Sequence, residues 1–141
     1  MEKSLAKLLK TIIYVMDIRG HSDCYIKLVD SENYTTNCKN FNLETIPKIV
    51  NYIIGGDDVY SIQVFDKFDQ YLGAISIILE DDPYDLIIDY SDNEDMNAIS
   101  DQYTGDIDEA IIKGRKENAD LEDIANFYEI DLEYLKKAIN Y

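Results

Sequence analysis

The sequence is poor in the residues that most often build metal and phosphate sites. It has two cysteines, Cys24 and Cys38, and one histidine, His21. This set is too small and wrongly spaced for a structural zinc site, which takes about four Cys or His ligands. The six glycines match no phosphate-binding loop. We therefore expect no cofactor and no bound metal ion.

Catalytic motifs are missing as well. His21, Ser22 and Asp23 are the residue types of a catalytic triad, but a triad takes its members from distant segments because neighbours in sequence cannot adopt its geometry. The acidic run 89–95 lacks the glycine and glutamate spacing of an EF-hand calcium loop. We therefore expect a protein that is not an enzyme. A small-ligand pocket formed by residues distant in sequence stays an open alternative.

Long apolar runs are absent too. No run approaches the roughly 18 residues that a membrane-spanning helix needs. The N-terminal Met-Glu-Lys-Ser lacks the basic region, apolar core and cleavage site of a signal peptide. A hydrophobic content of 46% excludes wholesale disorder, and 141 residues suit one folded core. We expect a cytoplasmic protein.

Basic residues are missing from one long stretch, residues 68–112, which we call the acidic block. The chain has 13 Lys and Arg against 29 Asp and Glu, a net charge of −16. The acidic block has no Lys or Arg and holds 13 of the acids: Asp69, Glu80, Asp81, Asp82, Asp85, Asp89, Asp92, Glu94, Asp95, Asp101, Asp106, Asp108 and Glu109. Such charge repels nucleic acid and anionic membranes, and it favours basic protein partners.

Hydrophobic periodicity predicts an α+β fold with an antiparallel sheet of about five strands and packed helices. The expected strands are 24–29, 34–41, 59–65, 71–79 and 84–90. Residues 74–79 are nearly all apolar, so we expect this strand to be covered on both faces. An amphipathic helix begins the chain, and we end it near residue 11, because the β-branched run 11–15 favours a strand.

Helix boundaries are marked by capping residues. Thr45 is a good N-cap, and Pro47 suits a first turn, where its missing N–H costs nothing. Glycines 55–56 tolerate the left-handed conformation that ends a helix. Further helices are expected near 93–103 and 106–116, with a final pair over 119–139.

Cys24 and Cys38 fall on opposite strands of the hairpin expected to turn at Ser31. A disulfide between them is geometrically open. In a reducing cytosol we expect two small thiols instead.

The last unit, residues 121–139, resembles a helix-turn-helix. The matching apolar positions are Ile124, Ala125, Ile130, Leu135 and Ala138. It departs from the pattern at Glu129, where most such motifs have Gly, and its second helix has few bases, Lys136 and Lys137. A DNA reader needs basic contacts to phosphate. We expect a helical hairpin for packing or homodimerisation, with DNA binding through the two lysines as the alternative.

The expected domains are a sheet domain, 1–105, and a C-terminal helical unit, 106–141, packed on the same core.

Tyrosine accompanies the acidic block, and tyrosine is common at protein interfaces because it offers large area at small entropic cost. The predicted partner-binding residues are Asp81, Asp82, Asp85, Asp89, Asp92, Glu94, Asp95, Tyr84 and Tyr90. Duplex DNA carries one negative charge per ~1.7 Å of axis, and carboxylates on a rigid sheet can approximate such a row. The expected function is a DNA mimic-like inhibitor that binds the basic surface of a nucleic-acid-binding protein.

In size, charge and lack of catalytic motifs, the chain resembles the small acidic inhibitors made by phages and mobile elements, the anti-CRISPR and anti-restriction class. That resemblance implies a host-defence protein as the target and the host cytoplasm as the location. Two other readings stay open beside the ligand pocket. One is an immunity or antitoxin protein that neutralises a basic toxin, and the other is a small helix-turn-helix regulator.

Overall fold

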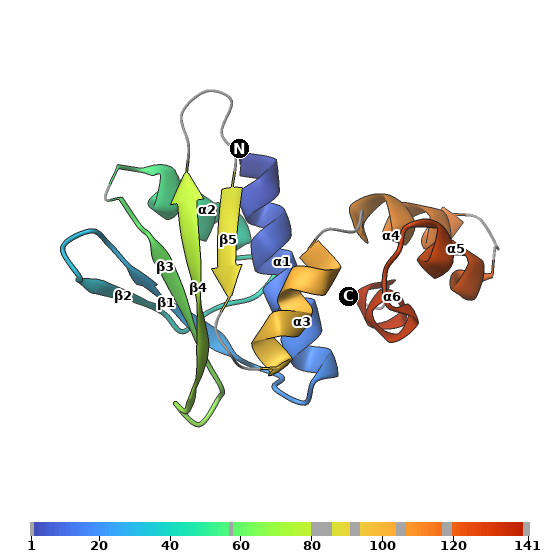
Figure 1. The fold of residues 1–141 in the computed structure, drawn as a ribbon, viewed down its shortest axis with the longest axis horizontal. Coiled ribbons are helices and arrows are strands. Elements are labelled where there is room, and N and C mark those ends of the chain that lie inside the picture. Colours follow the sequence, from blue (N-terminus) through green and yellow to red (C-terminus); the bar gives the residue numbers. More distant parts are fainter. Residues whose placement is uncertain are drawn as a thin grey trace.

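The computed structural model describes residues 2–56, 58–79, 86–90, 94–103, 107–116 and 120–139. The elements are α1 (Glu2–Ile18), β1 (Tyr25–Val29), β2 (Thr35–Cys38), α2 (Ile46–Ile54), β3 (Ser61–Phe65), β4 (Tyr71–Leu79), β5 (Leu86–Tyr90), α3 (Glu94–Tyr103), α4 (Ile107–Lys116), α5 (Leu121–Phe127) and α6 (Leu132–Ile139). The protein is α+β, with an antiparallel sheet and a helical C-terminus, as the periodicity predicts (Figure 1). No helix in these ranges has the length and apolar character to cross a bilayer.

The sheet order is β2-β1-β3-β4-β5, so β2 and β5 are the two edge strands. All four neighbouring pairs are antiparallel. The two expected hairpins form, one between β1 and β2 and the other between β3 and β4 (Figure 1). Within the first hairpin Cys38 pairs with Ile26 rather than with Cys24. Both cysteines are free thiols, as expected.

The first helix is longer than predicted. α1 continues to Ile18, so ending it near residue 11 was wrong. The β-branched run stays helical because this segment lies in the core, where Ile12, Val15 and Met16 are at most 3% exposed. Burial outweighs the weak strand preference of such residues. Thr11 adds a local bond, since its hydroxyl donates to the Lys7 carbonyl at 2.7 Å.

The second helix begins and ends where the capping residues predict. Thr45 is the N-cap of α2 and Gly55 the C-cap, and Gly56 has the left-handed φ of 110°. The Thr45 side chain makes no capping bond to the helix. Its hydroxyl instead bonds the backbone of Asn42 in the preceding turn. The expected position was therefore right, while the capping interaction differs.

One face of the sheet is covered and the other is open over the described side chains of β4. Ile62 and Ile75, which pair across β3 and β4, are fully buried and belong to the same core as α1, α2 and α3. Ser76, next along β4, is exposed. The expectation that residues 74–79 are covered on both faces was therefore wrong. The apolar run of β4 has a small polar residue at its solvent-facing position.

Candidate functional site

Part of the acidic block folds into elements that touch one another. β4 pairs with β5, and α3 contacts both strands as well as α1. β5 is an edge strand, so these elements lie on one side of the sheet (Figure 1). We call β4, β5 and α3 the acidic side. These three elements of the stretch without bases are therefore adjacent in space, which the sequence could not establish. Residues 107–112 of the stretch belong to α4, which contacts α5 and α6 instead.

The nine predicted partner-binding residues fall into three groups. Asp81, Asp82, Tyr84, Asp85 and Asp92 lie outside the described residues. Asp89 and Tyr90 belong to β5, where Asp89 pairs with Ser76 and Tyr90 with Ile75 in the backbone register, and their side chains lie outside the described part. Glu94 and Asp95 form the first turn of α3. Glu94 is exposed.

Asp95 is engaged within the protein. Its carboxylate lies 3.0 Å from His21 Nε2 and 3.7 Å from Arg19 Nη1, and its side chain is 35% exposed. Arg19 and His21 directly follow α1, so the carboxylate ties the end of α1 to the start of α3. An acidic residue also suits the first turn of a helix, where the helix dipole favours negative charge. Asp95 therefore has a structural role beside its predicted place in the interface.

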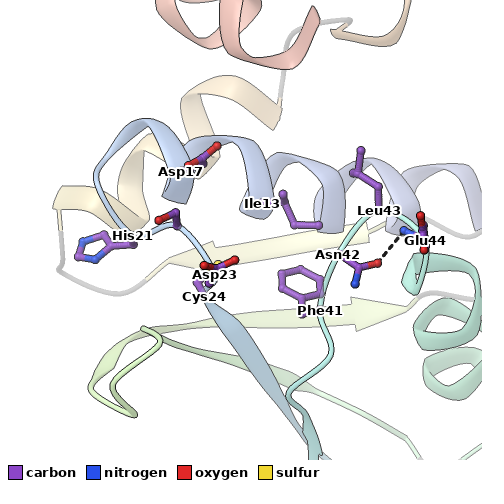
Figure 2. Close-up of a pocket in the computed structure, with 10 residues that line it drawn as sticks. Ile13, Asp17, His21, Asp23, Cys24, Phe41, Asn42, Leu43 and Glu44 are labelled. Carbon is purple, nitrogen blue, oxygen red and sulfur yellow. Dashed lines mark hydrogen bonds between the residues drawn. The ribbon is translucent and has the colours of Figure 1, made fainter. Parts of the chain in front are cut away.

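A cavity of about 330 Å³ lies beside the end of α1 (Figure 2). Figure 2 shows His21 at one end, Glu44 at the other, and Phe41 between them. Burial, with the nearby Asp17 carboxylate adding to it, raises the pKa of the Cys24 thiol in this cavity to about 12. The thiol therefore stays protonated at neutral pH, and a protonated thiol is a poor nucleophile.

The side chains of this cavity do not assemble the triad considered from the sequence. The His21 ring bonds Asp95, which is distant in sequence, rather than Asp23. Asp17 lies 3.4 Å from Lys137 Nζ. Over the described ranges, no group of three or more His, Cys, Asp or Glu side chains has the geometry to hold a metal ion. The cavity offers an apolar wall and scattered carboxylates.

The C-terminal helices have the turn of a helix-turn-helix. Glu129, between α5 and α6, has a left-handed φ of 56° at the position where such motifs carry Gly. The side chains of Leu135 and Ala138 are fully buried, as the resemblance implies. A Cβ added to Gly114 of α4 would lie 2.5 Å from Ile139, so α4 packs closely on α6. The expected pair of helices is therefore present, with its turn at Glu129, and the helix-turn-helix resemblance stays a prediction.

The second helix of this pair is occupied by contacts within the protein. α6 packs on α1 as well as on α4 and α5. Tyr134 of α6 is 1% exposed, and its ring lies 5.8 Å from the ring of Tyr14 on α1. Lys136 pairs with Glu133 at 3.6 Å, and Lys137 pairs with Asp17 of α1 at 3.4 Å. A recognition helix must insert one free face into the major groove, so this arrangement favours the packing role.

Strands β1 and β3 and the turn before β4 hold a cluster that sequence reasoning missed, and it includes Asp69 of the acidic block. Tyr25 and Phe65 stack with centroids 5.3 Å apart. Lys27 Nζ lies 4.5 Å from the centre of the Phe65 ring, and Lys39 Nζ lies 5.3 Å from that of Tyr25. The Tyr25 hydroxyl donates to Asp69 at 2.6 Å, which raises the pKa of Tyr25 to about 12 and lowers that of Asp69.

The charge balance of residues 24–56 could have signalled this cluster. That segment holds three acids, Asp30, Glu32 and Glu44, and three bases, Lys27, Lys39 and Lys48. It is therefore neutral in a chain of net charge −16.

Comparisons with family models, with curated proteins and with solved structures find no match for this chain.

Proposed function

We propose that this protein is a non-enzymatic inhibitor whose acidic side occupies the basic surface of a nucleic-acid-binding protein, with a host-defence protein as the target. The observation that carries the proposal is the placement of the base-free block on touching elements. Three elements of the block, β4, β5 and α3, touch one another at the β5 edge of the sheet, where Glu94 is exposed. A surface with charge of one sign increases the rate of association with an oppositely charged protein and orients that protein before contact.

Two further observations support this proposal over the alternatives. Burial keeps the Cys24 thiol protonated at neutral pH, and a protonated thiol is a poor nucleophile. The two lysines of α6, Lys136 and Lys137, are paired with Glu133 and Asp17 within the protein, which disfavours a DNA-reading regulator. An immunity protein that neutralises a basic toxin would use the same acidic side, and the identity of the captured partner separates these two functions.

The proposal predicts capture of a basic protein that depends on salt. The tagged protein is incubated with a cytosolic extract at about 50 mM salt and again at about 500 mM, where the Debye length falls to a few ångströms. We expect a basic nucleic-acid-binding protein to be retained at low salt and released at high salt. Duplex DNA added at low salt should also displace it, because both ligands compete for one surface. Capture of no basic protein at either salt would contradict the proposal.

A further inference from the structure

The opposite edge of the sheet is open to backbone pairing. The Asp30 N–H donates to the Tyr34 carbonyl at 3.0 Å where the β1–β2 hairpin closes. Hydrogen-bonded and non-bonded pairs alternate along an antiparallel ladder, so Thr36 bonds β1 while Thr35 and Asn37 point their N–H and C=O groups away from it. β2 is the outermost strand, and no described element lies beyond it (Figure 1). Such an edge is a template for another strand.

A groove runs beside this edge, between β2 and α2. Its cavity volume is about 260 Å³. Thr36 and Cys38 are half-buried, while Thr35 and Asn37 are exposed, so alternate side chains of β2 turn toward the groove. The Thr36 and Tyr52 hydroxyls bond each other at 2.6 Å and hold β2 against α2. A strand added to β2 would therefore place every second side chain at this groove.

The groove contrasts in charge with the rest of the chain. Its lining includes Lys39 and Lys48 but no Asp or Glu from the described residues. The Lys48 side chain is exposed, and that of Lys39 is 64% exposed although its ammonium group lies 3.4 Å from Asp69. The chain has 29 acids, but the groove has two lysines and no acid in its described lining. It is therefore suited to a ligand that carries carboxylates.

We propose that β2 is a docking edge for an extended acidic segment of another protein. The segment pairs its backbone with Thr35 and Asn37, places apolar side chains in the groove beside Ile49, and sets carboxylates against Lys39 and Lys48. In this mode of recognition the backbone bonds supply affinity, and the pockets for alternate side chains supply specificity. Nucleic acid has no peptide backbone to match the edge.

A second copy of this chain is a poorer occupant than an acidic segment. A second copy would add two more exposed lysines at this edge, and its groove, like the first, has no Asp or Glu among its lining residues to offer them. The docking edge and the acidic side lie on opposite edges of the sheet. The protein can therefore hold a basic partner and an acidic segment at the same time.

The test uses the full-length protein and a short synthetic peptide that alternates glutamate with valine. A peptide with lysine in place of glutamate is the charge control. Binding is followed through the backbone amide signals in two-dimensional NMR. We expect the glutamate peptide to shift the signals of residues 35–39 and 45–52 and to leave those of α5 and α6 unchanged. Equal binding of the lysine peptide would overturn the proposal.

Two pairs of variants test the groove and the edge separately. Lys48→Glu should weaken binding of the glutamate peptide about tenfold, while Lys116→Glu, a reversal of an exposed lysine on α4, should leave it unchanged. Asn37→Pro removes an outward N–H from an edge strand, where proline is tolerated, and should abolish binding. Asn37→Thr keeps that N–H and should bind normally.

Three results would overturn the proposal. The first is undiminished binding to Asn37→Pro, since backbone pairing at that position is then unnecessary. The second is loss of binding by Asn37→Thr as well as Asn37→Pro when circular dichroism shows both variants folded, since the N–H is then not the group that matters. The third is a concentration-dependent dimer of the unmodified protein that Asn37→Pro dissociates, since the edge then pairs with a second copy.

Discussion

The two edges of this sheet share one core and differ in nearly everything else. The β5 edge belongs to a stretch with 13 acids and no base, whereas residues 24–56, which contain the β2 edge, carry three of each. On the acidic side, internal pairing engages Asp95 through Arg19 and His21. On the β2 side, lysines lie over aromatic rings and beside a groove. A single antiparallel sheet thus presents two surfaces suited to partners of opposite charge.

The largest expected effect comes from breaking the core that both edges share. Ile62 of β3, a strand near the middle of the sheet, is fully buried. Ile62→Ala should lower the free energy of unfolding by about 2–5 kcal/mol, through lost burial and the cavity left behind. Chemical denaturation followed by circular dichroism measures the change. Amide exchange in β2 and β5 should accelerate together, and acceleration in one edge alone would show that the edges do not depend on one core.

Alkaline pH should destabilise the side of the molecule around β1. Burial raises the pKa of Cys24 from an ordinary 9.0 to about 12. The pKa of Tyr25 rises from 10.0 to about 12, and the largest cause is its hydrogen bond to Asp69. Both groups then keep their protons in the folded protein at a pH where the unfolded chain loses them. This stabilisation is present below pH 9 and should be lost progressively between about pH 9 and 12.

Urea titrations across that pH range test the alkaline prediction. The Cys24→Ala variant should flatten the decline between pH 9 and 12, because it removes the thiol whose pKa is shifted most. Its unfolding free energy at pH 7 sets the baseline against which the alkaline change is compared. A decline as steep in this variant as in the unmodified protein would show that the buried thiol is not a cause.

A smaller and local effect is expected at Asp95. Asp95→Asn weakens the contacts to Arg19 and His21 and removes a favourable charge from the start of α3. Because these groups are partly exposed, the loss in unfolding free energy should be about 1 kcal/mol or less. The amide exchange rate should rise in α3 and stay unchanged in β2, which would show that the effect is confined to the acidic side. Unchanged protection of α3 would show that the carboxylate does not hold α1 and α3 together.

Local signals in the sequence predicted most of the fold. Pro47 and the glycines after Ile54 marked the limits of α2, and the two hairpins followed from alternation and turn residues. The predictions were wrong where tertiary packing, rather than local sequence, determines the conformation or the burial of a segment. The run 11–15 is helical because its apolar members are buried against other elements. Residues 74–79 are apolar except for Ser76, and Ser76 is exposed to solvent.

The candidate surfaces were harder to predict than the elements. The absence of bases in residues 68–112 is visible in the sequence, but only the contacts among β4, β5 and α3 show that these three elements of the stretch are adjacent. The pairing of His21 with Asp95 joins residues 74 positions apart, so no local pattern reveals it. The groove beside β2 depends on where α2 lies over the sheet, and sequence spacing does not determine that position.

The most direct test of the central claim compares two variants with the same change in net charge. In one, Asp81, Asp82 and Asp85 of the acidic block become Lys, and in the other the same change is made at Glu32, Glu44 and Asp123, which are exposed and lie outside the block. The measurement is the affinity of each variant for the basic protein captured at low salt. We expect the first variant to lose binding by at least a hundredfold while remaining folded. The second variant has its long-range attraction reduced equally but should bind within about tenfold of the unmodified protein. Equal losses in the two variants would contradict this expectation, because net charge alone would then explain the attraction.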